Sequence, residues 1–157
     1  MINVFFPDEF ITKDDLYFMC YMVERIARKL KHRNKYVINK MGYEELAKKI
    51  SLANVLHSDN PNKVAEDFID EYNLEIGTFD ITKVNSELVD NIPTERQMGK
   101  VYQRLIIDTL DDDEDFVNGM IRVYNSPICE IIDDYNSSAY FEPSYVIARA
   151  YHNNSFN

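Results

Sequence analysis

The sequence predicts an all-α protein that folds as a single-domain bundle of six or seven helices. Apolar residues recur every three or four positions along most of the chain, which is the spacing of one helix face. Helix-capping residues precede these stretches, and the chain has only 4 Gly and 5 Pro, too few for a β fold built on many tight turns. We expect one domain over residues 1–157, with a helical half at 12–73, a connector at 74–94 and a second helical half at 95–152.

The N-terminal half contains the strongest helical signals. Thr12 and Asp15 have the spacing of a capping box, in which each side chain bonds the backbone N–H of the other residue. Gly42 suits a helix end, and Pro61 suits a helix start directly after the capping side chain of Asn60. The helices expected in this half cover residues 14–32, 43–57 and 61–72, with a short helical turn at 35–41.

The connector at 74–94 is the least helical part of the chain. Residues 76–82 alternate in polarity, which predicts a short strand or an extended connector, and Pro93 closes the segment. The acidic residues at 111–115 fit the start of a helix, because the helix macrodipole favours negative charge there. The helices expected in the second half cover residues 95–110, 116–124, 127–135 and 143–151.

Charge is distributed very unevenly along the chain. The net charge is −10, yet residues 25–49 carry nine Lys and Arg against two Glu, while residues 50–157 carry 7 basic and 20 acidic groups. Such an asymmetry can steer a charged partner. The net negative field disfavours non-specific binding of nucleic acid by the whole surface.

Several features indicate a cytoplasmic protein without a metal or cofactor. No segment approaches the ~18 apolar residues that span a membrane, and the first residues lack the basic start of a signal peptide. Cys20 and Cys129 stand among apolar neighbours, so we expect two buried, reduced thiols. His32, His57 and His152 lie far apart, with no second ligand at metal-binding spacing, so we expect no metal site.

The basic segment at 25–49 supports two functional alternatives. Its helices and their short connection resemble a helix-turn-helix, so the segment could belong to a nucleic-acid-binding regulator that acts as a dimer. Glu44 and Glu45 argue against this alternative, because carboxylates at the start of a recognition helix repel phosphate. The candidate basic patch consists of Arg25, Arg28, Lys29, Lys31, Arg33 and Lys35.

Arg25 and His32 support the second alternative, a ribonuclease. Some helical ribonucleases of the HEPN fold carry an Arg and a His at about this spacing near a helix end, where the imidazole moves a proton and the guanidinium holds a phosphate. In a regular helix, however, the two side chains do not share a face. No phosphate loop, dinucleotide fingerprint or nucleophile elbow occurs, so we favour binding over catalysis.

The segment at 123–145 is dense in Tyr, Asn, Ser and Asp. Such residues can satisfy buried backbone groups at helix breaks, and they also form good contact surfaces for a partner protein. Both interpretations stay open from the sequence. The candidate partner-binding residues are Asp133, Asp134, Tyr135, Asn136, Tyr140 and Tyr145.

Together with residues 99–106 (GKVYQRLI), this segment resembles small uncharacterised bacterial proteins that are encoded in gene cassettes with an ADP-ribosyltransferase-like toxin. The N-terminal helix pair, closed by Leu56-His57-Ser58, is similar to the short helical partner proteins of such cassettes. The resemblance implies an antitoxin or accessory role. Our leading hypothesis is therefore a protein-binding module that masks a partner protein, such as a toxin, through its acidic face and the 135–145 corner.

Overall fold

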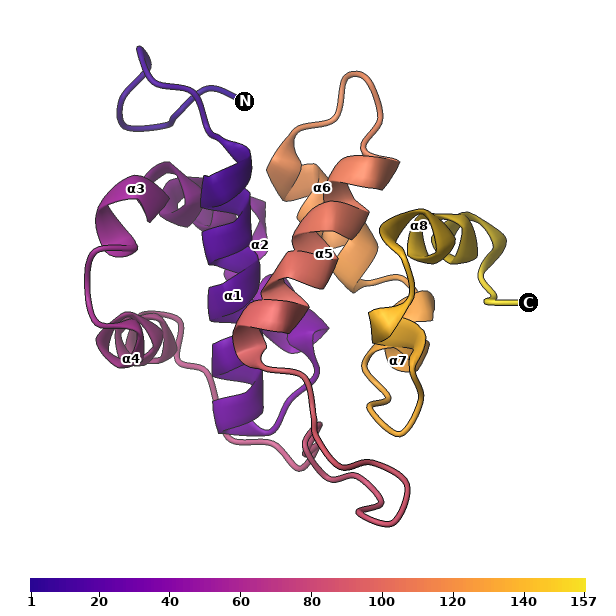
Figure 1. Cartoon of the computed structure of the whole chain (residues 1–157). Coiled ribbons are helices and arrows are strands. Elements are labelled where there is room, and N and C mark those ends of the chain that lie inside the picture. The colour runs from indigo at the N-terminus through magenta and orange to yellow at the C-terminus, as the bar shows by residue number, and fades with distance from the viewer.

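The computed structural model describes residues 1–157, and helices are its only regular secondary structure apart from one isolated antiparallel bridge between Ile2 and Phe10. The longer helices are α1 (Lys13–Leu30), α2 (Asn34–Ser51), α4 (Pro61–Glu71), α5 (Glu95–Thr109), α6 (Phe116–Tyr124) and α8 (Ser144–Asn153). The short ones are α3 (Ala53–Leu56), α7 (Ile128–Ile132) and the 3-10 turn η1 (Ala139–Phe141). Together they form one bundle (Figure 1), which confirms the all-α prediction.

Helix α1 is the centre of the bundle. It contacts α2, α3, α4 and α5, and Figure 1 shows α5 running alongside it. A close approach occurs at Gly99 of α5, where an added Cβ would lie 3.0 Å from the backbone N and the Cα of Tyr21 in α1. The lack of a side chain at Gly99 therefore lets the two helices pack backbone against backbone.

Local signals predicted several helix ends correctly. The Thr12 hydroxyl accepts a hydrogen bond from the Asp15 N–H, and the Asp15 carboxylate accepts one from the Thr12 N–H, as expected for a capping box. Gly42 interrupts α2 with a φ of 76°, so a helical segment lies on each side of it. Asn60 caps α4 directly ahead of Pro61.

The helix expected at 43–57 is not continuous. Helix α2 ends at Ser51, and Leu52 joins it to the short α3. The Ser51 carbonyl accepts a hydrogen bond from Asn3 Nδ2 at 2.7 Å, and the Ser51 hydroxyl accepts one from the Val4 N–H at 2.9 Å. The N-terminal loop thus binds to the joint between the helices, a long-range contact that hydrophobic periodicity does not report.

The connector between α4 and α5 contains no strand, so residues 76–82 form a connector, with a bend at Thr78 and a turn at 81–82. The Gly77 N–H donates to the Leu30 carbonyl at 2.7 Å, and the Phe79 N–H donates to the Lys31 carbonyl at 2.9 Å. The connector therefore lies against the C-terminal end of α1 (Figure 1), where it satisfies carbonyl groups that the helix leaves unpaired.

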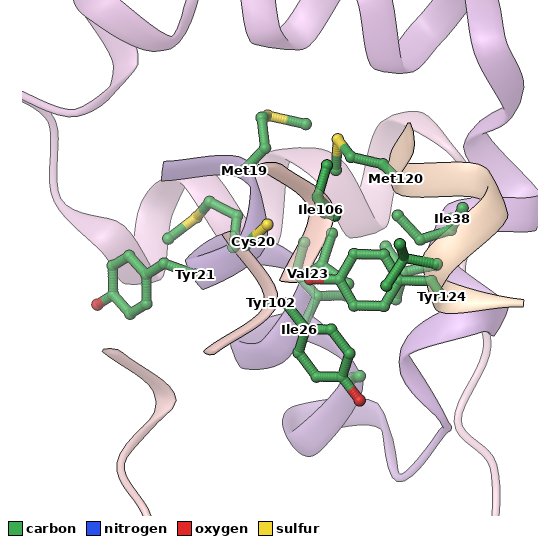
Figure 2. Packing of buried hydrophobic residues seen from close by; sticks show 14 of the residues in the cluster. Met19, Cys20, Tyr21, Val23, Ile26, Ile38, Tyr102, Ile106, Met120 and Tyr124 are labelled. Atoms are coloured by element: carbon green, nitrogen blue, oxygen red, sulfur yellow. The ribbon is translucent and has the colours of Figure 1, made fainter. Parts of the chain in front are cut away.

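The apolar core fills the space between α1, α2, α5 and α6. In Figure 2, side chains of α1 meet those of the other three helices, and the rings of Tyr102 and Tyr124 stack with centroids 4.6 Å apart. Cys20 and Cys129 are buried and unpaired, as expected. No helix combines the length and the apolar character needed to cross a membrane.

Candidate functional site

The side chains of Arg28 and Tyr135 meet inside the protein. From the sequence, Arg28 was predicted for the basic patch and Tyr135 for the partner-binding surface. Arg28 donates to the Glu24 carboxylate at 2.8 Å, to the Tyr135 hydroxyl at 3.1 Å and to the Pro93 carbonyl at 2.9 Å. The Tyr135 hydroxyl donates to Glu24 at 3.1 Å, and Asn34 Nδ2 donates to the other Glu24 oxygen at 3.0 Å. We call Glu24, Arg28, Asn34 and Tyr135 the buried polar network, because the Glu24 carboxylate at its centre is only 1% exposed.

Asp133 lies close to this network. The Tyr102 hydroxyl donates to Asp133 Oδ1 at 2.6 Å. Burial, and secondly the nearby charge of Glu24, raise the pKa of Asp133 well above its ordinary value. Asp133 and Tyr135 were predicted as partner-binding residues, but they are 5% and 1% exposed, and their polar groups are bonded inside the protein.

The predicted basic patch is not a continuous cationic surface. Four of its residues pair with carboxylates, as Arg25–Glu95 at 3.1 Å, Arg28–Glu24 at 2.8 Å, Lys29–Glu66 at 3.2 Å and Lys31–Asp80 at 3.5 Å. Only Arg33 and Lys35 form no ion pair. Carboxylates therefore lie against four of these six charges, one from the same helix and three from more distant parts of the chain.

Arg25 and His32 do not form a common site. The Arg25 guanidinium bonds Glu95 at the start of α5. The His32 ring stacks on Tyr36 with centroids 3.5 Å apart, and its Nε2 lies 2.7 Å from the Glu75 carbonyl in the connector. Since each side chain is held by a different part of the fold, the ribonuclease alternative loses its proposed pair.

Exposed aromatic side chains gather where η1 leads into α8. Phe141 is 81% exposed and Tyr145 is 70% exposed, while Tyr140 is half-buried beside them. Asp134 and Asn136 are exposed on the preceding loop. We call Tyr140, Phe141 and Tyr145 the aromatic corner, and it contains two of the candidate partner-binding residues.

A groove of about 290 Å³ separates the aromatic corner from α5. Its apolar lining comes from Val101, Leu105, Tyr140, Phe141 and Ile147, and its polar lining comes from Gln97, Lys100, Arg104, Glu142 and Ser144. Lys100 and Arg104 form no ion pair. Phe141, Lys100 and Arg104 were not among the site residues predicted from the sequence. For the two cations, the available signal was their recurrence with Arg96 at intervals of four, which places them on one helix face.

The aromatic corner is attached to well-packed elements. The Tyr140 ring packs edge-on against the buried Tyr135 ring, with centroids 5.5 Å apart. Ile147 and Ala150 anchor α8 and are 4% and 2% exposed, and α8 contacts α5 beside it (Figure 1). A rigid support of this kind lowers the entropy that a surface loses when it binds.

Comparisons with known proteins supply no family. No family model, no curated protein and no solved structure matches this chain.

The N-terminal loop carries a second group of exposed apolar side chains. The group consists of Ile2, Val4, Phe5, Phe6 and Phe10. Phe10 is 74% exposed, which makes it about as accessible as Phe141 and Tyr145 of the aromatic corner. The N-terminal loop is therefore a second exposed apolar surface, and it serves as the control for binding by the aromatic corner.

No three or more His, Cys, Asp and Glu side chains are grouped as metal ligands would be. His57 caps the C-terminal end of α3, and its Nδ1 lies 3.3 Å from the carbonyl of Ala53 one turn earlier, which is the helix-end contact expected for a lone histidine. The acidic loop at 111–115 is likewise explained by structure. Glu114 pairs with Arg122 at 2.6 Å, and the Asp115 side chain caps α6.

Proposed function

We propose that this protein is a protein-binding module and that its aromatic corner contacts the partner. The observation that carries the proposal is the pair Phe141 and Tyr145, whose side chains are 81% and 70% exposed. Phe141 lines the groove, and Tyr145 directly follows the lining residue Ser144. Burying a large apolar side chain contributes about 1.5–3 kcal/mol, so two rings supply the energy of a typical interface hot spot. Exposed aromatic rings beside a pocket are enriched at such interfaces.

The charges around the groove support a partner that offers carboxylates next to an apolar side chain. Lys100 and Arg104 line the groove without an ion pair, although the chain as a whole has a net charge of −10. A carboxylate placed between them would make charge-assisted hydrogen bonds. The acidic surface elsewhere would repel the same partner, and this difference would fix where and in which orientation it binds.

An antitoxin or accessory role is the specific form of this function that we propose. It is supported by the resemblance of residues 99–106 and 123–145 to proteins encoded beside ADP-ribosyltransferase-like toxins. A rigid aromatic corner could cover the working surface of a toxin at a low entropic cost. Binding of nucleic acid by the whole segment 25–49 is less favoured, since four of the six patch residues are already ion-paired.

The experiment uses the wild type and two variants to purify partners from the native host. Each variant replaces exposed aromatic rings with serine. The variant Phe141→Ser/Tyr145→Ser removes both exposed rings, whereas Phe10→Ser removes an equally exposed ring from the N-terminal loop. We expect the wild type and Phe10→Ser to recover one partner in stoichiometric amount, and the double variant to lose it. Absence of any stoichiometric partner, or its retention by the double variant, would contradict the proposal. Circular dichroism checks that all three chains are folded.

A further inference from the structure

We propose that a second site, separate from the aromatic corner, binds the phosphate group of a nucleotide. The site is a pocket of about 670 Å³ between the first turns of α2 and the connector. We call it the basic pocket and define it by its cations Lys31, Arg33, Lys35 and Lys40, together with His32. The inference does not depend on the proposed protein-binding function, because the two sites use different elements of the fold.

The composition of the basic pocket is unusual for this chain. Four of its ten lining residues are Lys or Arg, and none is Asp or Glu, although acidic groups outnumber basic ones by 27 to 17 in the sequence. Acidic side chains have thus been excluded from one recess of an acidic protein. A recess with this lining attracts small anions, because it has positively charged side chains and no carboxylate that would repel them.

The positive charge in the basic pocket is largely unneutralised. Arg33, Lys35 and Lys40 form no ion pair, and Lys31 pairs with Asp80 only at 3.5 Å in a half-exposed position. Helix α2 also begins here, and no side chain caps its first turn. A phosphate group has enough acceptor oxygens to bond guanidinium, ammonium and free backbone N–H donors at the same time.

The pocket also offers planar groups beside its cations. The Arg33 guanidinium lies over the Phe79 ring, 4.1 Å from its centroid, which fixes the direction of its N–H donors. The rings of His32 and Tyr36 form a stacked pair nearby, with centroids 3.5 Å apart. A phosphate attached to a planar base fits this combination better than inorganic phosphate does, because bases stack on aromatic and guanidinium planes.

Gly77 lets the connector lie close against the end of α1, where it forms one wall of the basic pocket. A Cβ at Gly77 would lie 2.5 Å from His32 Cε1 and 2.6 Å from the Lys31 carbonyl oxygen, so only glycine allows the connector to pass here. The Gly77 N–H bonds the Leu30 carbonyl at 2.7 Å and fixes this position. The pocket is therefore formed before a ligand arrives, as is usual for small-molecule sites.

The test measures binding of purified, full-length protein to AMP, GMP, inorganic phosphate and a single-stranded RNA of about ten nucleotides, by calorimetry and fluorescence anisotropy. The variant Arg33→Gln/Lys35→Gln removes two pocket cations. The control Lys13→Gln/Arg149→Gln removes two exposed cations elsewhere, so both variants have the same net charge. We expect the pocket variant to weaken nucleotide binding by about 10-fold or more, and the control to change it by less than about twofold.

The outcomes separate the two sources of a nucleotide. Binding of AMP or GMP that depends on the pocket cations supports a free nucleotide, and equally dependent binding of RNA alone supports a nucleotide within a strand. The proposal is overturned if no ligand binds at low salt, if the control weakens binding as much as the pocket variant, or if inorganic phosphate binds as tightly as the nucleotides. A folded Gly77→Ala variant should also weaken binding, because its Cβ displaces His32.

Discussion

Glu24→Ala tests whether the buried polar network holds the two halves of the chain together. Glu24 is 1% exposed and accepts hydrogen bonds from Arg28 at 2.8 Å, Tyr135 at 3.1 Å and Asn34 at 3.0 Å. Removing the carboxylate leaves a guanidinium whose side chain is only 12% exposed without its counter-charge. Breaking a buried ion pair from one side costs about 3–5 kcal/mol, so we expect a loss of this size in the free energy of unfolding.

Urea denaturation followed by helical circular dichroism measures this loss. The matched control is Glu66→Ala, which removes a surface ion pair with Lys29 in which the two side chains are 64% and 47% exposed; it should cost less than about 1 kcal/mol. Replacing both partners, as Glu24→Met/Arg28→Met, should recover part of the loss, because no uncompensated charge then stays buried. A loss from Glu24→Ala no larger than that from Glu66→Ala would refute the reasoning.

Three further predictions concern packing and buried polar groups. Gly99→Ala should destabilise the protein by about 1–3 kcal/mol, because its Cβ would meet backbone atoms of α1 at 3.0 Å. Gly119→Ala should cost less, because its Cβ would meet only side-chain atoms, Leu110 Cδ1 at 2.8 Å and Ile106 Cγ2 at 3.0 Å. Tyr102→Phe should cost about 1–3 kcal/mol by removing the partner of Asp133, while Tyr124→Phe should be neutral or stabilising, because the Tyr124 hydroxyl is buried without a hydrogen bond. Burial raises the pKa of Asp133, so the folded state keeps a proton that the unfolded state releases above about pH 4. Wild type should therefore lose stability relative to Asp133→Asn as the pH rises from that value.

The same denaturation measurement checks all three predictions. Equal losses at Gly99 and Gly119 would show that the α1–α5 approach does not limit packing. A Tyr124→Phe variant less stable than wild type would mean that its hydroxyl has a bonding partner. A difference between wild type and Asp133→Asn that stays constant from about pH 4 to about pH 8 would contradict a raised pKa.

The sequence was sufficient for features that depend on neighbouring residues. Helix α6 covers Phe116–Tyr124, as its periodicity and the acidic residues before it predict. The capping box at Thr12 and the break at Gly42 were also readable, because each depends on a few consecutive residues. The break after Ser51 was not, since it involves the N-terminal loop 48 residues away.

The candidate site was predictable only in part, because burial of polar groups is decided by distant partners. Tyr135 has the composition of a contact residue, but its hydroxyl bonds Glu24, 111 residues earlier in the chain. The charge of 25–49 likewise gave no indication that Glu95 would neutralise Arg25 from 70 residues away. Tyr145, one of the candidate partner-binding residues, is exposed, whereas nothing local distinguished the exposed Phe141 from a core phenylalanine.

Site-specific photo-crosslinking in the native host tests the proposed binding role most directly. A photo-reactive phenylalanine derivative would replace Tyr145 in the aromatic corner in one strain and Phe10 in the N-terminal loop in another. We predict one crosslinked protein of defined mass from position 145 and none of that mass from position 10. No crosslink from position 145, or the same crosslink from both positions, would contradict the claim that the aromatic corner is the partner-binding surface.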